Sequence, residues 1–390
     1  TGSSNITTTG VGSFGSLDIS GDIDVDGTAN LDVVDVDGAV NFAADVTFAD
    51  GADIITATAG TSNFRAGVNA GNSIASGGNY NTVVGDEAGT AITTGDNNVA
   101  IGFEALSTED TGRQSVAIGY QALKTQNKDD TNLNTAIGYQ AGTSITLGVS
   151  NDIFGGSAGD ALTEGSFNVA IGRSSLSTDT LGSQSVAVGH AALSTQNFTT
   201  ATNALNTAVG FSAGNAVTTG VENTLVGGNA GDALTDADEN IAVGGFSLSA
   251  DTLGSRSTAV GFGSLNAQNF TTATNTYNTA LGYYTGTAIT TGVENTLIGG
   301  QTGDALTTGG RNTAVGYAAL SEEDAHGYNT AIGYVALLNQ NAGADAYNVA
   351  VGASAGQSVT TGIRNTLIGG IAGDALTDAD YNVAMGYQAL

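Results

Sequence analysis

The chain has no cysteine, no proline, no tryptophan, one methionine and only 8 lysines and arginines among 390 residues. Without cysteine, no disulfide can hold the fold. Charged residues make up 12% of the chain, too few for the polar faces of long amphipathic helices, so strands and turns are expected. No apolar run approaches the ~20 residues that span a bilayer, so no membrane insertion is expected.

The charge balance is strongly acidic, since 37 Asp and Glu residues give a formal net charge of −29. Such a surface repels phosphate backbones, which excludes nucleic acid as a partner. Residues 1–62 hold ten aspartates and no lysine or arginine, and apolar and acidic residues alternate from Leu17 to Val36. This alternation predicts half-buried strands, and we interpret 1–62 as an acidic, β-structured shaft or connector.

What the chain has in quantity is one short phrase, Asn or Ser followed by small or branched residues and a glycine, as in NTAIG at 134–138. The phrase starts 19 times between Asn63 and Leu390, mostly at intervals of 17 residues. A fixed short period is typical of a solenoid, in which each unit buries its apolar face against its neighbours. Residues 63–390 are therefore predicted to be all-β, a parallel β-roll or β-solenoid of about 19 coils.

A longer period lies on top of the coil. Counting the Asn or Ser as position 1, position 9 is Gly, Gly, Leu, Leu in rotation, so four coils make one super-repeat of about 70 residues. The super-repeats begin at 63, 134, 206, 278 and 348, and inserts such as 127–133, 197–205 and 269–277 close them. These inserts are expected to bulge from one edge of the rod.

Within a coil, position 4 is a large apolar residue and is predicted to point inward. Position 3 is also apolar, usually alanine, and adjacent strand residues point to opposite faces, so the strand is predicted to be buried on both sides. The second buried face favours an oligomer, with alanines letting backbones approach around a shared axis, and we predict a homotrimer. A second strand is expected later in the coil, for example at 91–94 or 288–291.

The glycine at position 5 stands in all 19 coils. A turn that needs positive φ or close backbone approach explains it, and the Asn at position 1 tolerates the same backbone region. The predicted turn glycines of the first regular coils are Gly85, Gly102, Gly119, Gly138, Gly155 and Gly172.

The phrases NNVAIGFEAL (97–106), SVAIGYQAL (115–123) and NTAIGYQAG (134–142) resemble the head repeats of trimeric autotransporter adhesins. They resemble more closely the NTAIGYQAL arrays of marine bacteriophage tail-fibre proteins. The resemblance covers 63–390 and implies a left-handed β-roll in a homotrimer, although these coils are longer than those of adhesin heads. It implies the structural shaft of a phage tail or capsid fibre, located in the virion. The alternative is a trimeric adhesin or filament at the cell surface.

The partners expected of such a shaft are two further copies of the chain, other virion tail or fibre proteins, and a host glycan receptor contacted through a tip outside this chain. No cofactor, metal or catalytic residue is expected. His190 and His326 stand near turn positions without a recurring partner set, and the acids of the GDAL phrases are interpreted as turn residues. These acids are Asp160, Asp232, Asp304 and Asp374.

Position 6 is aromatic in many coils and predicts an exposed or inter-chain ladder, with packing between chains favoured over sugar contact. Its members are Phe103, Tyr120, Tyr139, Phe211, Phe262, Tyr283, Tyr317, Tyr334 and Tyr387.

Two other patterns suggest a ligand, calcium in one case and ice in the other. Asp22, Asp24 and Asp26 have the spacing of the first ligands of a helix-loop-helix calcium site, but Val33 stands where the bidentate Glu is needed. We therefore interpret these aspartates as the solvent-exposed face of a strand. Pairs such as Thr93-Thr94 suggest ice binding, but they mostly return only once in four coils.

Overall fold

The computed structural model describes residues 59–390. The predictions of a β-structured connector over 1–62 and of a wet acidic strand at Asp22–Asp26 therefore lie outside the described residues, apart from 59–62. The strand order below is that of the described part of the chain.

Each of the 19 coils contributes one strand of three residues, and four shorter strands of two residues lie near the inserts. The three-residue strands are β1 (Phe64–Ala66), β2 (Thr82–Val84), β3 (Val99–Ile101), β4 (Val116–Ile118), β5 (Thr135–Ile137), β6 (Asp152–Phe154), β7 (Val169–Ile171), β9 (Val186–Val188), β11 (Thr207–Val209), β12 (Thr224–Val226), β13 (Ile241–Val243), β15 (Thr258–Val260), β17 (Thr279–Leu281), β18 (Thr296–Ile298), β19 (Thr313–Val315), β20 (Thr330–Ile332), β21 (Val349–Val351), β22 (Thr366–Ile368) and β23 (Val383–Met385). The two-residue strands are β8 (Gly182–Ser183), β10 (Thr202–Asn203), β14 (Gly254–Ser255) and β16 (Thr274–Asn275).

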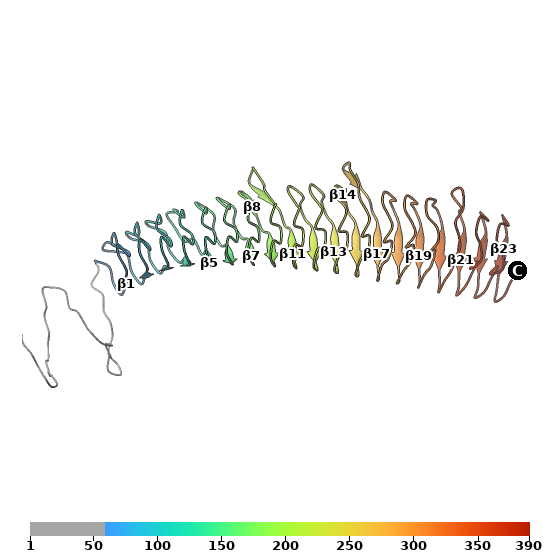
Figure 1. The fold of residues 1–390 in the computed structure, drawn as a ribbon, viewed down its shortest axis with the longest axis horizontal. Helices are drawn as coiled ribbons and strands as arrows, with labels where there is room; N and C mark the ends of the chain where they lie inside the picture. Colours follow the sequence, from blue (N-terminus) through green and yellow to red (C-terminus); the bar gives the residue numbers. More distant parts are fainter. Residues whose placement is uncertain (1–58) are drawn as a thin grey trace, which may run out of the picture. The chain divides into compact units, whose positions relative to one another are not determined.

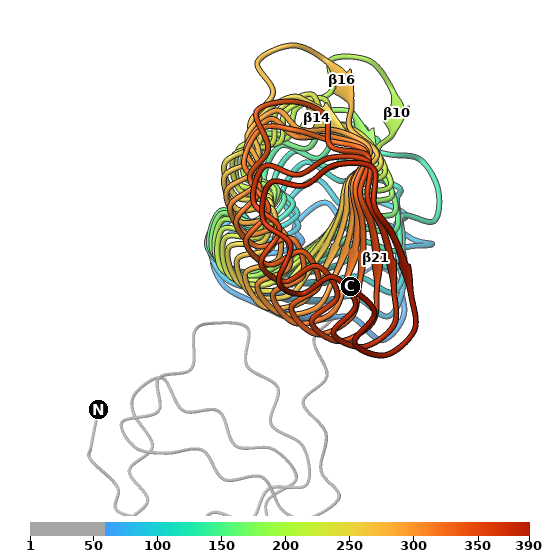
Figure 2. The same ribbon diagram turned by 90° about the vertical axis from the view of Figure 1, so that its right-hand side faces the viewer.

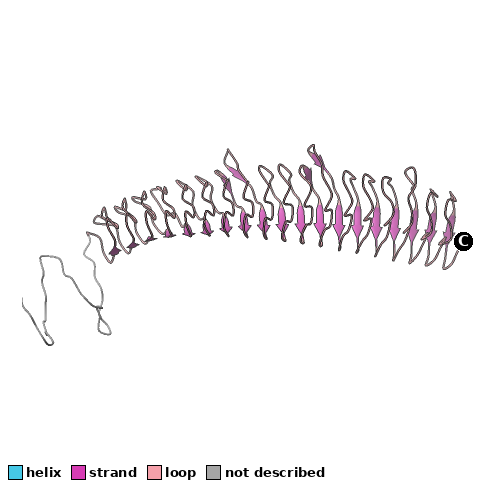
Figure 3. Ribbon diagram, viewed as in Figure 1, coloured by secondary structure: helices cyan, strands magenta, loops and turns pink. Residues whose placement is uncertain are grey.

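The long strands form one parallel 19-stranded sheet in which each pairs with the strands of the coils before and after it. The register is exact, so that Thr135 lies opposite Val116 on one side and Asp152 on the other. Figure 1 shows this unit as a row of stacked coils, and Figure 3 shows its strands lining one side. The all-β parallel solenoid predicted from the 17-residue period is confirmed.

The strand faces are the reverse of the prediction. From β2 onward, position 3 points into the coil and is buried, as at Ala100, Ile153 and Leu225, whereas positions 2 and 4 are half-buried or exposed on the outer face. The predicted inward placement of position 4 is wrong. The alanines at position 3 face the lumen of their own coil and not a shared axis, because the lumen is too narrow for a large side chain on every strand.

The turn glycines adopt the backbone conformation predicted for them. The six named glycines have φ between 125° and 145°. A Cβ on Gly138 would lie 2.4 Å from the carbonyl oxygen of Gly155 in the next coil, so both φ and space require glycine.

The Asn at position 1 has a different role from the one predicted. Positive φ belongs to the residue before it, such as Tyr80 or Asn97, and not to the Asn itself. The buried Asn side chains instead form a ladder: Asn223 Nδ2 donates to the Ala237 carbonyl (2.7 Å), and Asn223 Oδ1 accepts from the Asn240 amide (3.0 Å). This ladder satisfies backbone groups that the three-residue strands leave unpaired.

Packing of the lumen explains the four-coil rotation. In the first two coils of a super-repeat, Gly at position 9 leaves room for an apolar residue at position 12, as with Gly142 and Ile145, whose Cδ1 would lie 3.0 Å from an added Cβ. In the last two coils, a buried Leu at position 9, such as Leu176 or Leu193, is combined with a buried polar residue at position 12. One large apolar side chain per coil from these two positions keeps the lumen filled without overpacking.

The second strand predicted at 91–94 and 288–291 is absent, because both segments are turns and bends. Backbone bonds still join the coils there, for example from the Thr93 amide to the Asp110 carbonyl (2.7 Å). The inserts do project from the coil edge as predicted: viewed along the rod, the loops carrying β10 and β16 stand out from the stack (Figure 2).

Candidate interaction surfaces

A continuous feature of the surface is the outer face of the sheet, formed by positions 2 and 4 of the strands in 64–385. It consists mainly of Thr and Val at position 2 and Val, Ile and Leu at position 4. Asp152 is the only charged residue at these positions in the described strands. Several members are more than a third exposed, including Phe154, Ile171 and Leu281. An apolar, nearly uncharged face of this length on a chain of charge −29 is typical of an interaction surface.

The aromatic ladder lies just past the turn glycine, beside the sheet. Its rings stack on one another from coil to coil within one chain: Phe103 on Tyr120 at 5.4 Å between centroids, and Tyr120 on Tyr139 at 5.1 Å. His190 continues the series by stacking on Phe211 at 5.4 Å, in agreement with its interpretation as an outward ladder residue. All nine predicted members are at least 40% exposed, so the ladder lies on the surface of the single chain.

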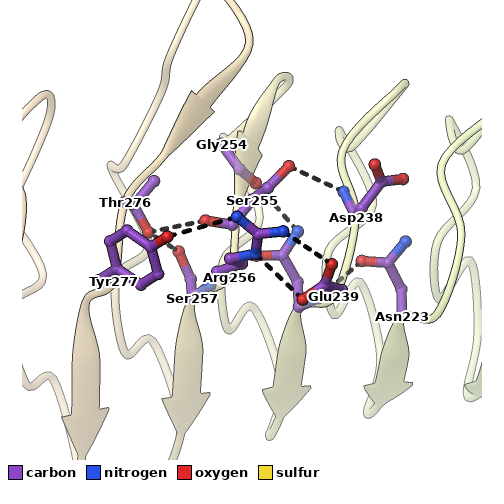
Figure 4. A network of polar contacts seen from close by, with 10 residues as sticks. Asn223, Asp238, Glu239, Gly254, Ser255, Arg256, Ser257, Thr276 and Tyr277 are labelled. Carbon is purple, nitrogen blue, oxygen red and sulfur yellow. Dashed lines mark hydrogen bonds and ion pairs between the residues drawn. The ribbon is translucent and has the colours of Figure 1, made fainter.

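A third ladder, which the sequence analysis did not find, consists of the residues before position 1. Figure 4 shows its centre, where Arg256 reaches Glu239 in the preceding coil (Nε to Oε2, 3.0 Å) and Tyr277 in the following one. The hydrogen bonds from Arg256 lower the pKa of the Glu239 carboxyl. Arg311 lies over Tyr328 and Arg364 over Tyr381 in the same way, at 5.4 and 5.3 Å from the ring centroids. The salt bridges of Arg256 and Arg311 thus neutralise two surface carboxylates, and cation–π contacts hold the guanidinium groups against the neighbouring rings.

Four carboxylates are buried in the lumen at position 12, and the sequence analysis missed these as well. Asp179 accepts from Gln196 Nε2 (2.6 Å), the Gly182 amide (3.0 Å) and the Phe198 amide (3.1 Å). The equivalent residues Glu109, Asp251 and Glu323 are also fully buried. Each accepts from the Gln of the next coil, and each lies one coil before an insert. A Glu or Asp followed 17 residues later by Gln was the available sequence signal.

Burial raises the pKa of the Asp179 and Glu109 carboxyls, because desolvation disfavours the charged form more than the hydrogen bonds restore it. The amide of the second insert residue, Phe198 in this case, is held by the carboxylate. These clusters therefore fasten the base of each insert to the coil below.

The acids of the GDAL phrases and His326 do not form a common site. Asp232 accepts from Asn229 Nδ2 and Asp304 from Ser321 Oγ, while burial raises the pKa of Asp160. His326 lies near Glu323, with Nδ1 and Oε1 3.4 Å apart.

Among residues 59–390, Glu323, Asp324 and His326 are the one group whose ligand atoms lie close enough to share a metal, within 4.8 Å. Glu323 is already engaged by the His326 amide and Gln340 Nε2, so its carboxylate has a structural role without any ion.

Within the described part of the chain there is no helix with the length and hydropathy of a membrane span. No protein-family model matches the sequence, and a search of curated proteins finds no match either. The surfaces themselves therefore carry the functional argument.

Proposed function

We propose that residues 63–390 form the shaft of a homotrimeric bacteriophage tail or capsid fibre that projects a receptor-binding tip toward the host. The observation that carries this proposal is the apolar outer face of the sheet, which runs the length of a stack of coils. The resemblance of NTAIGYQAG and its relatives to phage fibre arrays supports the virion as the location. The shaft acts through reach, without catalysis, and joins other fibre proteins at its ends.

The dimensions of the outer face suit self-association. Nineteen strands spaced by about 4.8 Å give a height of roughly 90 Å, and three residues give a width of about 10 Å. The resulting roughly 900 Å² is comparable with the ~800 Å² per partner of a standard protein interface. Because Asp152 is the only acid at positions 2 and 4 of the described strands, copies can meet here with little like-charge repulsion.

Sedimentation equilibrium of the purified chain tests the association. We expect a trimer, and we expect Val226→Lys with Ile298→Lys to dissociate it, because each places an ammonium group on the outer face. Thr291→Lys with Thr361→Lys adds the same two charges at exposed positions outside the sheet and should leave the trimer intact. A monomeric parent chain, or equal dissociation by the control, would overturn the proposed interface.

The second candidate, a trimeric adhesin or filament at the cell surface, rests on the same resemblance. Immunogold electron microscopy of the source material with antibodies against residues 63–390 separates the two. Label on thin fibres of virions supports the phage shaft. Label on cell envelopes, with none on virions, replaces it by the adhesin.

A further inference from the structure

The aromatic ladder is interrupted at regular intervals, and the interruptions leave ring faces uncovered. Position 6 is glycine in the second coil of four successive super-repeats, at Gly156, Gly228, Gly300 and Gly370. Before the first three of these glycines, position 6 of the preceding coil is a ring, which therefore has a ladder neighbour on one side only, whereas Ala353 stands before Gly370. Tyr139 stacks on Tyr120 with planes 8° apart, and Phe211 stacks on His190 with planes 12° apart. Since these rings lie nearly parallel from coil to coil, their free faces point toward the glycine of the next coil.

The space above those faces is open. A Cβ built on Gly156 or on Gly228 would meet no atom within 4 Å. Neither glycine has positive φ, so the backbone does not require glycine at these two positions. Tyr139 and Phe211 are 57% and 59% exposed, whereas Tyr120, covered on both faces, is 41% exposed. The third such ring, Tyr283, is 58% exposed, but the position at Gly300 is not open, because the Tyr317 ring comes within 3.7 Å of a Cβ built there.

The ladder positions at Gly156 and Gly228, above the free ring faces of Tyr139 and Phe211, are called the vacant rungs below. We propose that these vacant rungs are stacking sites for the pyranose rings of a neutral polysaccharide. The apolar C–H face of a sugar ring matches an uncovered aromatic face, and a rigid aromatic side chain offers contact area at low entropic cost. The residue after each glycine is polar, Ser157 in one case and Asn229 in the other, and Asn229 Nδ2 donates to Asp232. The chain charge of −29 disfavours anionic polymers.

The two sites are spaced for a polymer. Tyr139 and Phe211 are four coils apart in an in-register parallel sheet, which places them about 19 Å apart. A single extended chain can therefore occupy both sites. Weak stacking at each site then adds through avidity, and a trimer would present several such rows. The ladder lies beside the outer face of the sheet, so binding there does not depend on the proposed fibre function.

Affinity electrophoresis of the full chain in native gels tests the proposal, with hydroxyethyl cellulose, dextran or mannan as neutral probes and dextran sulfate as the anionic one. We expect retardation by at least one neutral polymer and none by dextran sulfate. Tyr139→Ala with Phe211→Ala should weaken the apparent affinity by roughly 100-fold through lost avidity. Tyr80→Ala with Phe167→Ala removes two rings of similar exposure, 61% and 56%, from outside the ladder and should change nothing.

A second variant separates stacking from general aromatic adhesion. Gly156→Tyr with Gly228→Tyr fills the vacant rungs and covers the free faces while adding two aromatic rings. We expect it to abolish retardation, whereas nonspecific adhesion would increase it. Unchanged or increased retardation in this variant, or no retardation of the parent chain by any neutral polymer, would refute the sites.

Discussion

Replacing one Asn of the buried ladder by Ala should lower the local free energy of unfolding of the coils that this Asn joins. Asn223→Ala deletes the donor to the Ala237 carbonyl and the acceptor for the Asn240 amide, at 2.7 and 3.0 Å. Asn223 is fully buried, so water does not replace either partner without opening the coil. Two orphaned buried groups at about 1–3 kcal/mol each predict a loss of roughly 3 kcal/mol.

Hydrogen exchange measured by mass spectrometry is the suitable assay, because a stack of coils opens locally and exchange locates the coils that are destabilised, whereas urea unfolding gives only the total loss. Three kcal/mol corresponds to roughly 100-fold faster exchange, and we expect it in peptides spanning 220–245, with little change beyond the neighbouring coils. Asn203→Ala, which truncates an exposed Asn in β10, serves as the control and should leave exchange unchanged. A change below threefold at Asn240 would show that the ladder is not what holds the coils together.

The other predictions concern the turns, the buried acids and one irregular coil. Gly138→Ala should cost about 2–3 kcal/mol in urea unfolding, because φ is 145° and the Cβ meets the next coil, whereas Gly156→Ala should cost almost nothing. Because burial raises the pKa of Asp179, the folded state holds a proton that the unfolded state has released. Stability should thus fall as pH rises from the ordinary carboxyl range through the raised pKa, and Asp179→Asn should flatten this slope in urea midpoints. Asn329→Ser should cost far less than Asn223→Ala, because it removes the Asn348 amide's acceptor at 3.3 Å but also a buried Nδ2 without a partner, and Ser at this position in earlier super-repeats accepts from the following Gln. Hydrogen exchange around Asn329 should change by less than roughly tenfold, and a change as large as that of Asn223→Ala would contradict this account.

The period of the sequence by itself determined the class of fold. A phrase that returns every 17 residues with glycine at position 5 predicts a solenoid, because every coil must then have the same backbone path as the coil before it. The structure confirms the parallel solenoid and the positive φ of that glycine. The rotation at position 9 also marked the super-repeat, and the inserts project where the sequence placed them. These features are local or periodic, so no knowledge of distant contacts was needed to predict them.

The direction of the side chains was decided only by the tertiary structure. Adjacent strand residues are both apolar here, so alternation could not tell inside from outside, and the prediction chose the larger residue at position 4. Positions 9 and 12 already place a large apolar side chain in the lumen of many coils, so most strands turn their smaller residue inward, as at Ala136 beside Ile137, whereas coils such as that of Ile153 admit a large strand residue as well. The buried Asn ladder and the buried carboxylates such as Asp179 were missed for a related reason. Polar residues look like surface residues in a sequence, and only the stacking of one coil on the next supplies the backbone partners that let them be buried.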